Sequence, residues 1–455
     1  MSAHEMLIRG GTLVLLDGPV RADIAVSEGA ISAIEPELAG GAIEEIDATG
    51  LHVLPGTIDA HAHFNEPGRT EWEGFATGSR ALAAGGATSF IEMPLNAYPP
   101  TTDAASFDAK REAAERASVL DFALWGGLVP GNLDELETLA ERGVAGFKAF
   151  MSTSGTEDFE AADDLTLLEG MARAADLGLP VAVHAESDEL TRRLSRRAVS
   201  EGRASARDYL ASRPVVAELE AVQRAILFAE ETGCSLHVVH VSTGRGVALV
   251  AEARARGVDV SCETCPHYLV MRGEDAERLG AIAKCAPPLR PAEDQRDLWE
   301  RVEAGEVDLI ASDHSPCPPD LKDTPDFFAA WGGISGCQSL LPLALDAAHH
   351  GRGLPLERVA GLLSSAPADR FGLSPPKGRL EAGADADLAL VALDERHTLR
   401  EEELRYRHRV SPYVGREVRG RVVRTISRGR TVFRDGVDVE TSGGRLLTPR
   451  KTSKV

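Results

Sequence analysis

Polar side chains that can bind metal ions recur at one end of a series of apolar segments in this chain of 455 residues. His61 and His63 close the first segment, and because they are two residues apart they face the same side of a strand. Later segments carry further candidates in the same position: Lys148, His184, His240 and Asp313. Imidazole nitrogens suit zinc and similar divalent ions. We therefore predict a metal site made of these residues, in which Asp313 also accepts a proton from the attacking water.

Lys148 is the unusual member of this set, because an ammonium group cannot bind a metal and is unfavourable when buried. A lysine that burial keeps neutral can instead react with carbon dioxide. The resulting carbamate is anionic and offers one oxygen to each of two ions, which in binuclear sites lie ~3.5–4 Å apart and activate a water to hydroxide near neutral pH. Lys148 could otherwise be a surface lysine, or a Schiff-base lysine as in barrel aldolases.

The other candidates also have simpler interpretations. An isolated His-x-His pair is often structural, and a lone His184 or His240 is often a hydrogen-bonded histidine of the core. Asp313 precedes Ser-Pro, where it could cap a turn. His237 lies three residues before His240, so we expect it to pack or hydrogen-bond on the other face of that strand. Because all the candidates fall at the ends of apolar segments, their pattern favours the metal site over these alternatives.

The apolar segments alternate with helix-like segments rich in Ala and Leu. Eight apolar runs occur, at residues 56–61, 87–93, 119–125, 144–150, 181–184, 235–241, 258–263 and 307–313. Alternation of strand and helix implies parallel strands, because parallel neighbours need a crossover connection. Eight repeats predict closure into a (β/α)8 TIM barrel, here residues 56–377, whose active-site residues lie at the carboxyl ends of the strands.

Short strand-like segments separated by turns fill both chain ends, at residues 6–55 and again from residue 386 onward. Two β-rich ends around a different middle predict one small β-sandwich domain, made of residues 1–55 and 378–455. The predicted fold class is therefore α/β, a TIM barrel with a β domain contributed by both termini. The polar tail from residue 441 is expected to be mobile.

The composition narrows the possible partners. A formal net charge of −22 disfavours binding to nucleic acids and anionic membranes. We expect no signal peptide and no membrane span, because the apolar residues near the N-terminus are interrupted and no apolar run is long enough to span a bilayer. Six cysteines do not suggest a disulfide framework, and the CxxC pair of Cys262 and Cys265 has no second pair, so we interpret it as part of a strand end. We expect a reduced cytoplasmic protein with a small-molecule substrate.

Several segments resemble, in order and at suitable distances, the motifs of the cyclic amidohydrolases, a group that includes dihydroorotases, hydantoinases and allantoinases. Residues 59–68 resemble the signature of the first strand, and residues 146–148 resemble the carboxylated-lysine motif. Residues 184–186, 236–242, 263–268 and 312–316 resemble the remaining motifs, and the similarity extends over residues 10–436. The resemblance implies two divalent ions, zinc by preference, a carbamate on Lys148 and a homotetramer. It implies these ligands: His61, His63, Lys148, His184, His240 and Asp313.

Within this group, residues 66–75, 93–102, 313–319 and 331–334 resemble the allantoinase form. Dihydroorotases usually place an arginine where Asn65 stands, and hydantoinases usually carry a tyrosine shortly after the lysine, which residues 149–152 lack. The resemblance thus implies hydrolysis of the hydantoin ring of allantoin to allantoate. A hydantoinase or dihydropyrimidinase-type activity is the first alternative, and a dihydroorotase the second. A non-catalytic scaffold on the same fold is disfavoured by the complete set of ligands.

The substrate contacts are predicted less directly. The ureido arm of allantoin is neutral and forms hydrogen bonds, which favours amide or backbone partners over a cation. Asn65 and Asn96 follow the first two apolar runs and could supply such groups, although Asn96 could equally be a turn residue before Tyr98. The resemblance adds backbone groups near Ser315 and Gly333 as contacts for the ring.

Overall fold

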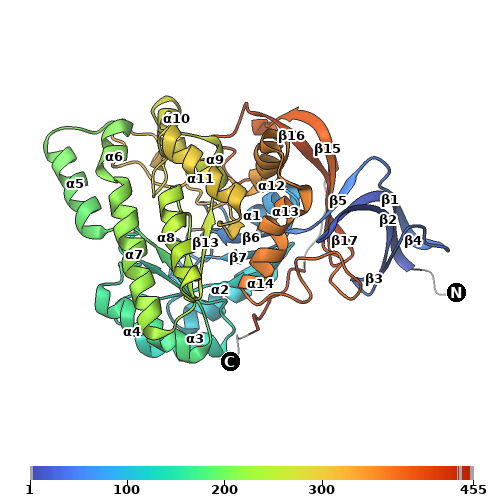
Figure 1. Ribbon diagram of the computed structural model, residues 1–455, viewed down its shortest axis with the longest axis horizontal. Helices are drawn as coiled ribbons and strands as arrows, with labels where there is room; N and C mark the ends of the chain where they lie inside the picture. Colours follow the sequence, from blue (N-terminus) through green and yellow to red (C-terminus); the bar gives the residue numbers. More distant parts are fainter. Residues whose placement is uncertain (1–3, 438, 440–442, 451–455) are drawn as a thin grey trace.

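The barrel and the β domain lie side by side in the computed structural model, which describes residues 4–437, 439 and 443–450 (Figure 1). The strands of the first part of the chain, in blue, lie beside those of its last part, in orange and red, at one end of the molecule (Figure 1). Among the described residues, none of the helices is long and apolar enough to cross a membrane.

Parallel strands form the barrel. They are, in chain order, β6 (Thr57–Ala62), β7 (Ala87–Glu92), β8 (Asp121–Leu124), β9 (Gly126–Gly127), β10 (Phe147–Phe150), β11 (Val181–His184), β12 (Leu236–Val238), β13 (Val260–Thr264) and β14 (Leu309–Ile310). β8 and β9 are two parts of one strand interrupted at Trp125, so the described residues provide the eight predicted strand positions. A parallel bridge between Ala62 and His314 closes the ring. The (β/α)8 prediction is confirmed.

The strands are buried on both faces, which explains why they appear in the sequence as unbroken apolar runs. All residues of β6, β7, β10 and β11 are buried. A charged or imidazole side chain in such a run is therefore an exception. The predicted ligands His61 and His184 are exceptions toward the carboxyl ends of β6 and β11, whereas buried Asp121 lies at the start of β8.

Helices connect the strands and cover the barrel. The main crossover helices are α1 (Phe75–Ala84), α2 (Ala104–Ala117), α3 (Leu136–Glu141), α4 (Asp164–Leu177), α7 (Val215–Thr232), α8 (Gly244–Ala255) and α11 (Ala292–Ala304). The remaining helices are α5 (Asp188–Ser200), α6 (Ala206–Ser212), α9 (Pro266–Val270), α10 (Gly273–Leu279), α12 (Leu340–Ala344), α13 (Leu356–Ala360) and α14 (Ala366–Arg370). Asp163 begins α4 by accepting a hydrogen bond from the Thr166 N–H at 2.8 Å. Gly178 ends the same helix in the left-handed conformation that favours glycine.

Both chain ends build the β domain, as predicted. Its strands are β1 (His4–Leu15), β2 (Gly18–Ser27), β3 (Ala30–Glu35), β4 (Ala42–Asp47), β5 (His52–Pro55), β15 (Leu388–Thr398), β16 (Glu417–Ser427) and β17 (Arg430–Arg434). In the described part of the chain they form one continuous hydrogen-bonded sheet, where a sandwich would have two separate sheets. β5 joins the two chain ends, because it pairs with β1 on one side and β15 on the other. The domain limits at residues 55 and 378 stay a prediction.

Polar contacts and the C-terminal tail connect the two domains. The Lys377 amine lies 2.7 Å from Asp121 Oδ2, at the start of β8, and 2.7 Å from Asp387 Oδ2, next to the β domain. The tail departs from our expectation of mobility over its described residues 443–450. The Phe122 N–H donates to the Arg445 carbonyl at 2.9 Å, and the Leu447 N–H donates to the Phe122 carbonyl at 2.7 Å. Residues 441–442 and 451–455 lie outside the described residues.

Candidate metal centre and active site

The residues that the sequence marks as metal ligands come together at one end of the barrel. This follows from the fold, because the carboxyl ends of parallel barrel strands meet at the same rim. The ligands follow the strands in this order: His61 near the end of β6 and His63 just beyond it, Lys148 in β10, His184 at the end of β11, His240 after β12 and Asp313 after β14.

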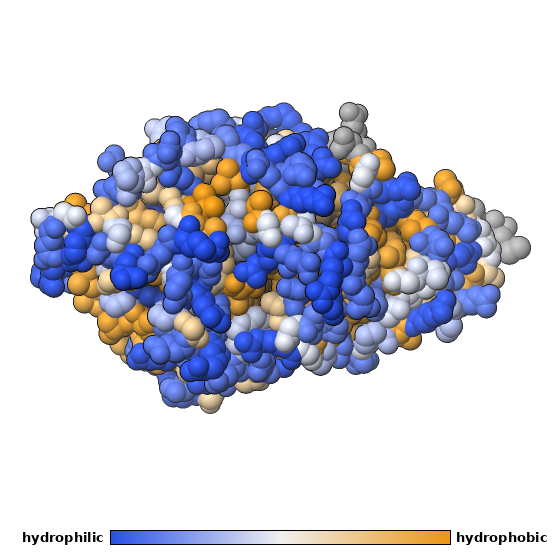
Figure 2. Space-filling view, turned by 90° about the horizontal axis from the view of Figure 1, so that it is seen from above, coloured by the Kyte–Doolittle hydropathy of each residue, from blue (hydrophilic) through white to orange (hydrophobic). Residues whose placement is uncertain are grey.

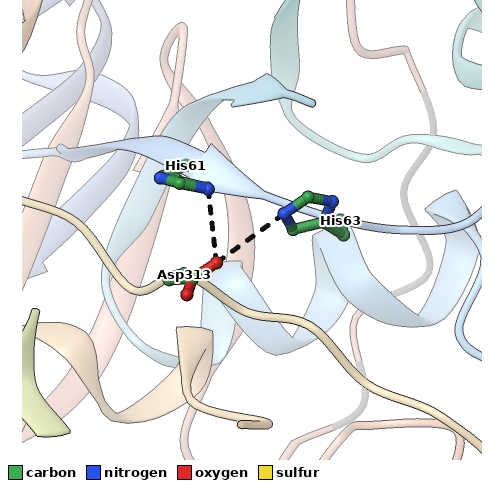
Figure 3. Close-up of side chains that lie close together, drawn as sticks. All are labelled: His61, His63 and Asp313. Atoms are coloured by element: carbon green, nitrogen blue, oxygen red, sulfur yellow. Dashed lines mark ion pairs between the residues drawn. The ribbon is translucent and has the colours of Figure 1, made fainter. Parts of the chain in front are cut away.

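His61, His63 and Asp313 form the first cluster (Figure 3). Asp313 Oδ1 lies 3.2 Å from His61 Nε2 and 3.6 Å from His63 Nε2. One ligand atom from each residue lies within 4.8 Å of the other two, a spacing that suits a single metal ion. Burial by itself raises the pKa of Asp313, but His61 and the other imidazoles around it lower that pKa well below its usual range. Asp313 is therefore a carboxylate.

His184 and His240 form the second cluster. His184 Nδ1 lies 3.0 Å from His240 Nε2, so the two rings direct nitrogen atoms at the same point. Burial lowers the pKa of both imidazoles, which keeps them neutral and able to bind a metal.

Lys148 has the environment that a carbamate would require. Its side chain is fully buried, and its amine has no hydrogen-bond partner among the described residues. Burial lowers the pKa of this amine to about 8, against the opposing effect of Glu263 and Asp313. A buried cation without a partner is unfavourable, so the site calls for a chemical change or a ligand that the protein atoms do not supply.

The backbone around these clusters is strained. His240 and Asp313 have φ angles of 40° and 46°, and Asn65 and Asn96 have φ angles of 63° and 67°. Left-handed backbone is unfavourable for residues other than glycine, although asparagine tolerates it best. Such residues gather at functional sites, where the surrounding structure holds them.

A cavity of about 660 Å³ opens over the two clusters. Its walls include His61, His63, His184, His240 and Asp313. Phe150, Tyr209 and Trp331 add aromatic surface. A largely preformed cavity with convergent polar groups at its base is typical of a site for a small molecule.

Comparison with known proteins identifies this arrangement. The sequence model of the amidohydrolase family matches residues 52–432. An allantoinase of Rubrobacter xylanophilus is 66% identical over 451 residues, which cover 99% of both chains. An allantoinase of Solibacter usitatus is 59% identical, over 98% of this chain and 97% of the relative. The chain belongs to the allantoinases of the amidohydrolase family. It is therefore a hydrolase of cyclic amides, as its motifs predict.

Solved structures of the same superfamily share the amidohydrolase fold. An L-hydantoinase (dihydropyrimidinase) from Arthrobacter aurescens superposes with a TM-score of 0.95 at 38% identity, over 98% of this chain and 100% of that one. A D-hydantoinase superposes with a TM-score of 0.92 at 29% identity, over 98% of this chain and 99% of that one.

Glu263 is a site residue that the sequence analysis missed. Its Oε1 lies 2.5 Å from His61 Nδ1, and its Oε2 lies 3.1 Å from His237 Nε2. Burial raises the pKa of Glu263, but His61 and His237 outweigh burial and lower it to about 2. A carboxylate on Nδ1 leaves Nε2 of His61 free to bind a metal. The sequence contains a signal that could have identified this residue, because Glu263 is a charged residue within a buried strand. His237 hydrogen-bonds as expected.

Glu186 supports the second cluster in the same way. Its Oε2 lies 2.9 Å from His184 Nε2, and Arg213, which lines the cavity, pairs with the same oxygen. Burial opposes ionisation, but Arg213 and His184 lower the pKa of Glu186 to about 2. Its position two residues after His184 at a strand end was the available signal, whereas nothing in the sequence singles out Arg213.

The predicted substrate contacts fall in different places. The Asn96 amide lies 3.3 Å from His63 Nδ1 and borders the cavity. With its oxygen turned toward Nδ1, this amide would hold a proton there and leave Nε2 of His63 for a metal. Asn65 is fully buried, is missing from the described residues that line the cavity, and donates to the Pro316 carbonyl at 3.3 Å.

Ser315 and Gly333 border the cavity together. The Ser315 hydroxyl donates to Asp313 Oδ1 at 3.1 Å. A side chain at Gly333 would bring its Cβ within 2.3 Å of the Ser315 carbonyl oxygen, so the close approach of the two backbones requires glycine. Contact of these residues with substrate stays a prediction. Cys262 and Cys265 are buried free thiols, in keeping with a strand end.

Proposed function

We propose that the enzyme hydrolyses the ring amide of allantoin to give allantoate. The observation that carries this proposal is the contrast in similarity within one fold. Identity is 66% to an allantoinase over 99% of both chains, but 38% to an L-hydantoinase with the same fold. The fold defines the class of reaction, and the closer similarity points to the substrate.

The residues present fit a binuclear metal centre, for which we propose zinc. His61, His63 and Asp313 would hold one ion, and His184 and His240 the other. Lys148, as a carbamate formed with carbon dioxide, would lie between them, and its buried amine without a partner supports this role. When bound, the ions lower the pKa of water to near neutral and polarise the carbonyl group that is attacked.

Asp313 is the proposed catalytic residue. It borders the cavity beside His61 and His63, where it would accept the proton of the attacking water and return it to the leaving ring nitrogen. The Ser315 hydroxyl holds the carboxylate in place, and Glu263 and Asn96 hold the two imidazoles. We propose that Asn96, and the backbone near Ser315 and Gly333, position the arm and ring of the substrate. Asn65, which is buried away from the cavity, would act indirectly by holding the Pro316 carbonyl in the loop after Asp313.

A hydantoinase or dihydropyrimidinase-type activity is the second candidate, which the TM-score of 0.95 to the L-hydantoinase favours. Purified, metal-loaded protein should be tested on allantoin, hydantoin, dihydrouracil and dihydroorotate. We expect the highest kcat/KM with allantoin. A fully metal-loaded preparation that opens hydantoin or dihydrouracil and leaves allantoin intact would assign the enzyme to the other branch.

We further propose that the enzyme is a cytoplasmic homotetramer. Apolar residues reach the surface in patches among a mainly hydrophilic exterior (Figure 2). On α4 and α7, Leu165, Val216 and Leu227 are more than half exposed, which would suit contact with another subunit. Light scattering coupled to size-exclusion chromatography would give the mass, and a monomer at working concentration would refute the tetramer.

A further inference from the structure

Lysine is scarce in this chain and is mostly buried where the structure describes it. It occurs only at positions 110, 148, 284, 322, 377, 451 and 454. Among the described lysines, exposure is 0% for Lys110 and Lys148, 2% for Lys377 and 6% for Lys284, and Lys322 is partly buried. A buried ammonium is unfavourable unless it is well bonded, so each of these lysines apart from Lys148, the proposed carbamate, needs compensating contacts.

Lys284 and Lys322 find those contacts in an unusual way. Lys110 and Lys377 pair with carboxylates. Among the described residues Lys284 and Lys322 have no such partner, and both amines donate to backbone carbonyl oxygens. Their acceptors lie mainly in residues 328–333, which we call the rim segment.

Each amine contacts two carbonyl groups of the rim segment that lie two positions apart, Lys284 in its first half and Lys322 in its second half. Lys284 Nζ lies 2.5 Å from the Ala330 carbonyl oxygen and 3.2 Å from that of Phe328. Lys322 Nζ lies 2.8 Å from the Gly333 carbonyl oxygen and 3.2 Å from that of Trp331. The carbonyl of Lys284 also accepts from the Gly333 N–H at 2.8 Å. Because each peptide unit is planar, fixing these carbonyls fixes the orientation of the whole segment.

The rim segment is one wall of the active-site cavity. All its residues border the cavity, and Lys284 borders it as well. Trp331 also packs edge-on against Trp72, at 4.7 Å between ring centroids, so the segment contacts the loop that follows β6. A segment without regular secondary structure depends on such contacts for its position.

We propose that Lys284 and Lys322 are positioning residues for the hydrolysis, which together hold the rim segment in the conformation that completes the substrate cavity. The substrate part of this inference rests on the proposed function. The hydrogen bonds of an ammonium to carbonyls are charge-assisted and directional, so a neutral side chain of similar length cannot replace them.

The test compares Lys284→Met, Lys322→Met and the double variant with Lys377→Met, a matched loss of a buried lysine far from the cavity. We call Lys284 and Lys322 together the clamp. In each clamp variant we expect the KM for allantoin to rise about tenfold or more, with kcat changed less than about threefold and metal content unchanged. Because both lysines hold one segment, the double variant should resemble the worse single variant. Lys322→Arg should recover part of the loss.

Hydrogen exchange supplies a readout that does not depend on the substrate. Amides of the rim segment should exchange faster in both clamp variants than in the wild type and in Lys377→Met, while those of β10 should not change. Unchanged exchange and unchanged KM would overturn the proposal, and so would a loss of kcat at constant KM. If the wild type does not act on allantoin, the proposed function fails, and the exchange data still decide the role of the clamp.

Discussion

Lys148 is the residue on which the proposed metal centre depends most directly, because its amine is buried and lacks a partner among the described residues. Lys148→Ala should lose the bridge between the two ions, and metal content should fall together with activity, by at least ~100-fold. Small carboxylic acids should restore part of the rate by replacing the carbamate. Elemental analysis and kcat should be measured on the same preparation, and full activity in the variant would refute the bridge.

Asp313 is expected to transfer a proton as well as to bind a metal. Asp313→Asn keeps the shape of the side chain but cannot accept the proton, so kcat should fall by ~10²–10⁴-fold. The variants His184→Ala and His240→Ala should instead lose activity mainly because they lose metal. A near-normal kcat in Asp313→Asn with metal retained would remove this residue from the mechanism.

Replacement of Asn96 should affect both the binding of metal and the binding of substrate. Its amide contacts His63 Nδ1, so Asn96→Ala should weaken metal binding by ~10–100-fold and lower kcat/KM for both allantoin and hydantoin. If the amide also contacts the ureido arm, the loss for allantoin should be the larger one at saturating metal. An equal loss for the two substrates would limit Asn96 to orienting His63.

At the scale of elements, the clamp of Lys284 and Lys322 should make substrate binding depend on pH. Burial lowers the pKa of Lys284 to about 7, and repulsion from Arg213 and Lys322 adds to this, while Asp326 opposes it. The charged form therefore predominates below pH 7 and is lost as the pH rises. We expect KM to increase between pH 6 and pH 9. In Lys284→Met this increase should be reduced, and an identical pH profile in both proteins would show that Lys284 does not control it.

At the scale of the whole molecule, Lys377 joins the barrel to the β domain. Its amine contacts Asp121, Asp385 and Asp387, all within 2.8 Å. Lys377→Met leaves buried carboxylates without this partner, which should lower the free energy of unfolding by ~3–5 kcal/mol and lower Tm by several degrees. Arg173→Met removes an exposed ion pair with Asp134, worth ~1 kcal/mol or less. A Tm change no larger than that of this control would contradict the prediction.

The sequence by itself determined the strand pattern and the kinds of ligand. His61, His63, His184, His240 and Asp313 stand out because each is a polar residue at the end of a buried apolar run, and parallel strands bring such ends together in any closed barrel. The same logic applied to Glu263 would have found it. Local motifs predicted that the chain belongs to the allantoinases within the family, and the full-length similarity to an allantoinase confirmed this assignment.

Tertiary structure decided everything that depends on contacts between distant segments. Glu263 meets His61 across 202 positions of the chain, and no local pattern encodes that distance. Burial of the Asn65 side chain and pairing of residues 445–447 with Phe122 likewise depend on which surfaces meet after folding. The clamp is the clearest case. A lysine in a sequence has no defined partner, and only the packed chain shows that these two amines bind the backbone of one loop.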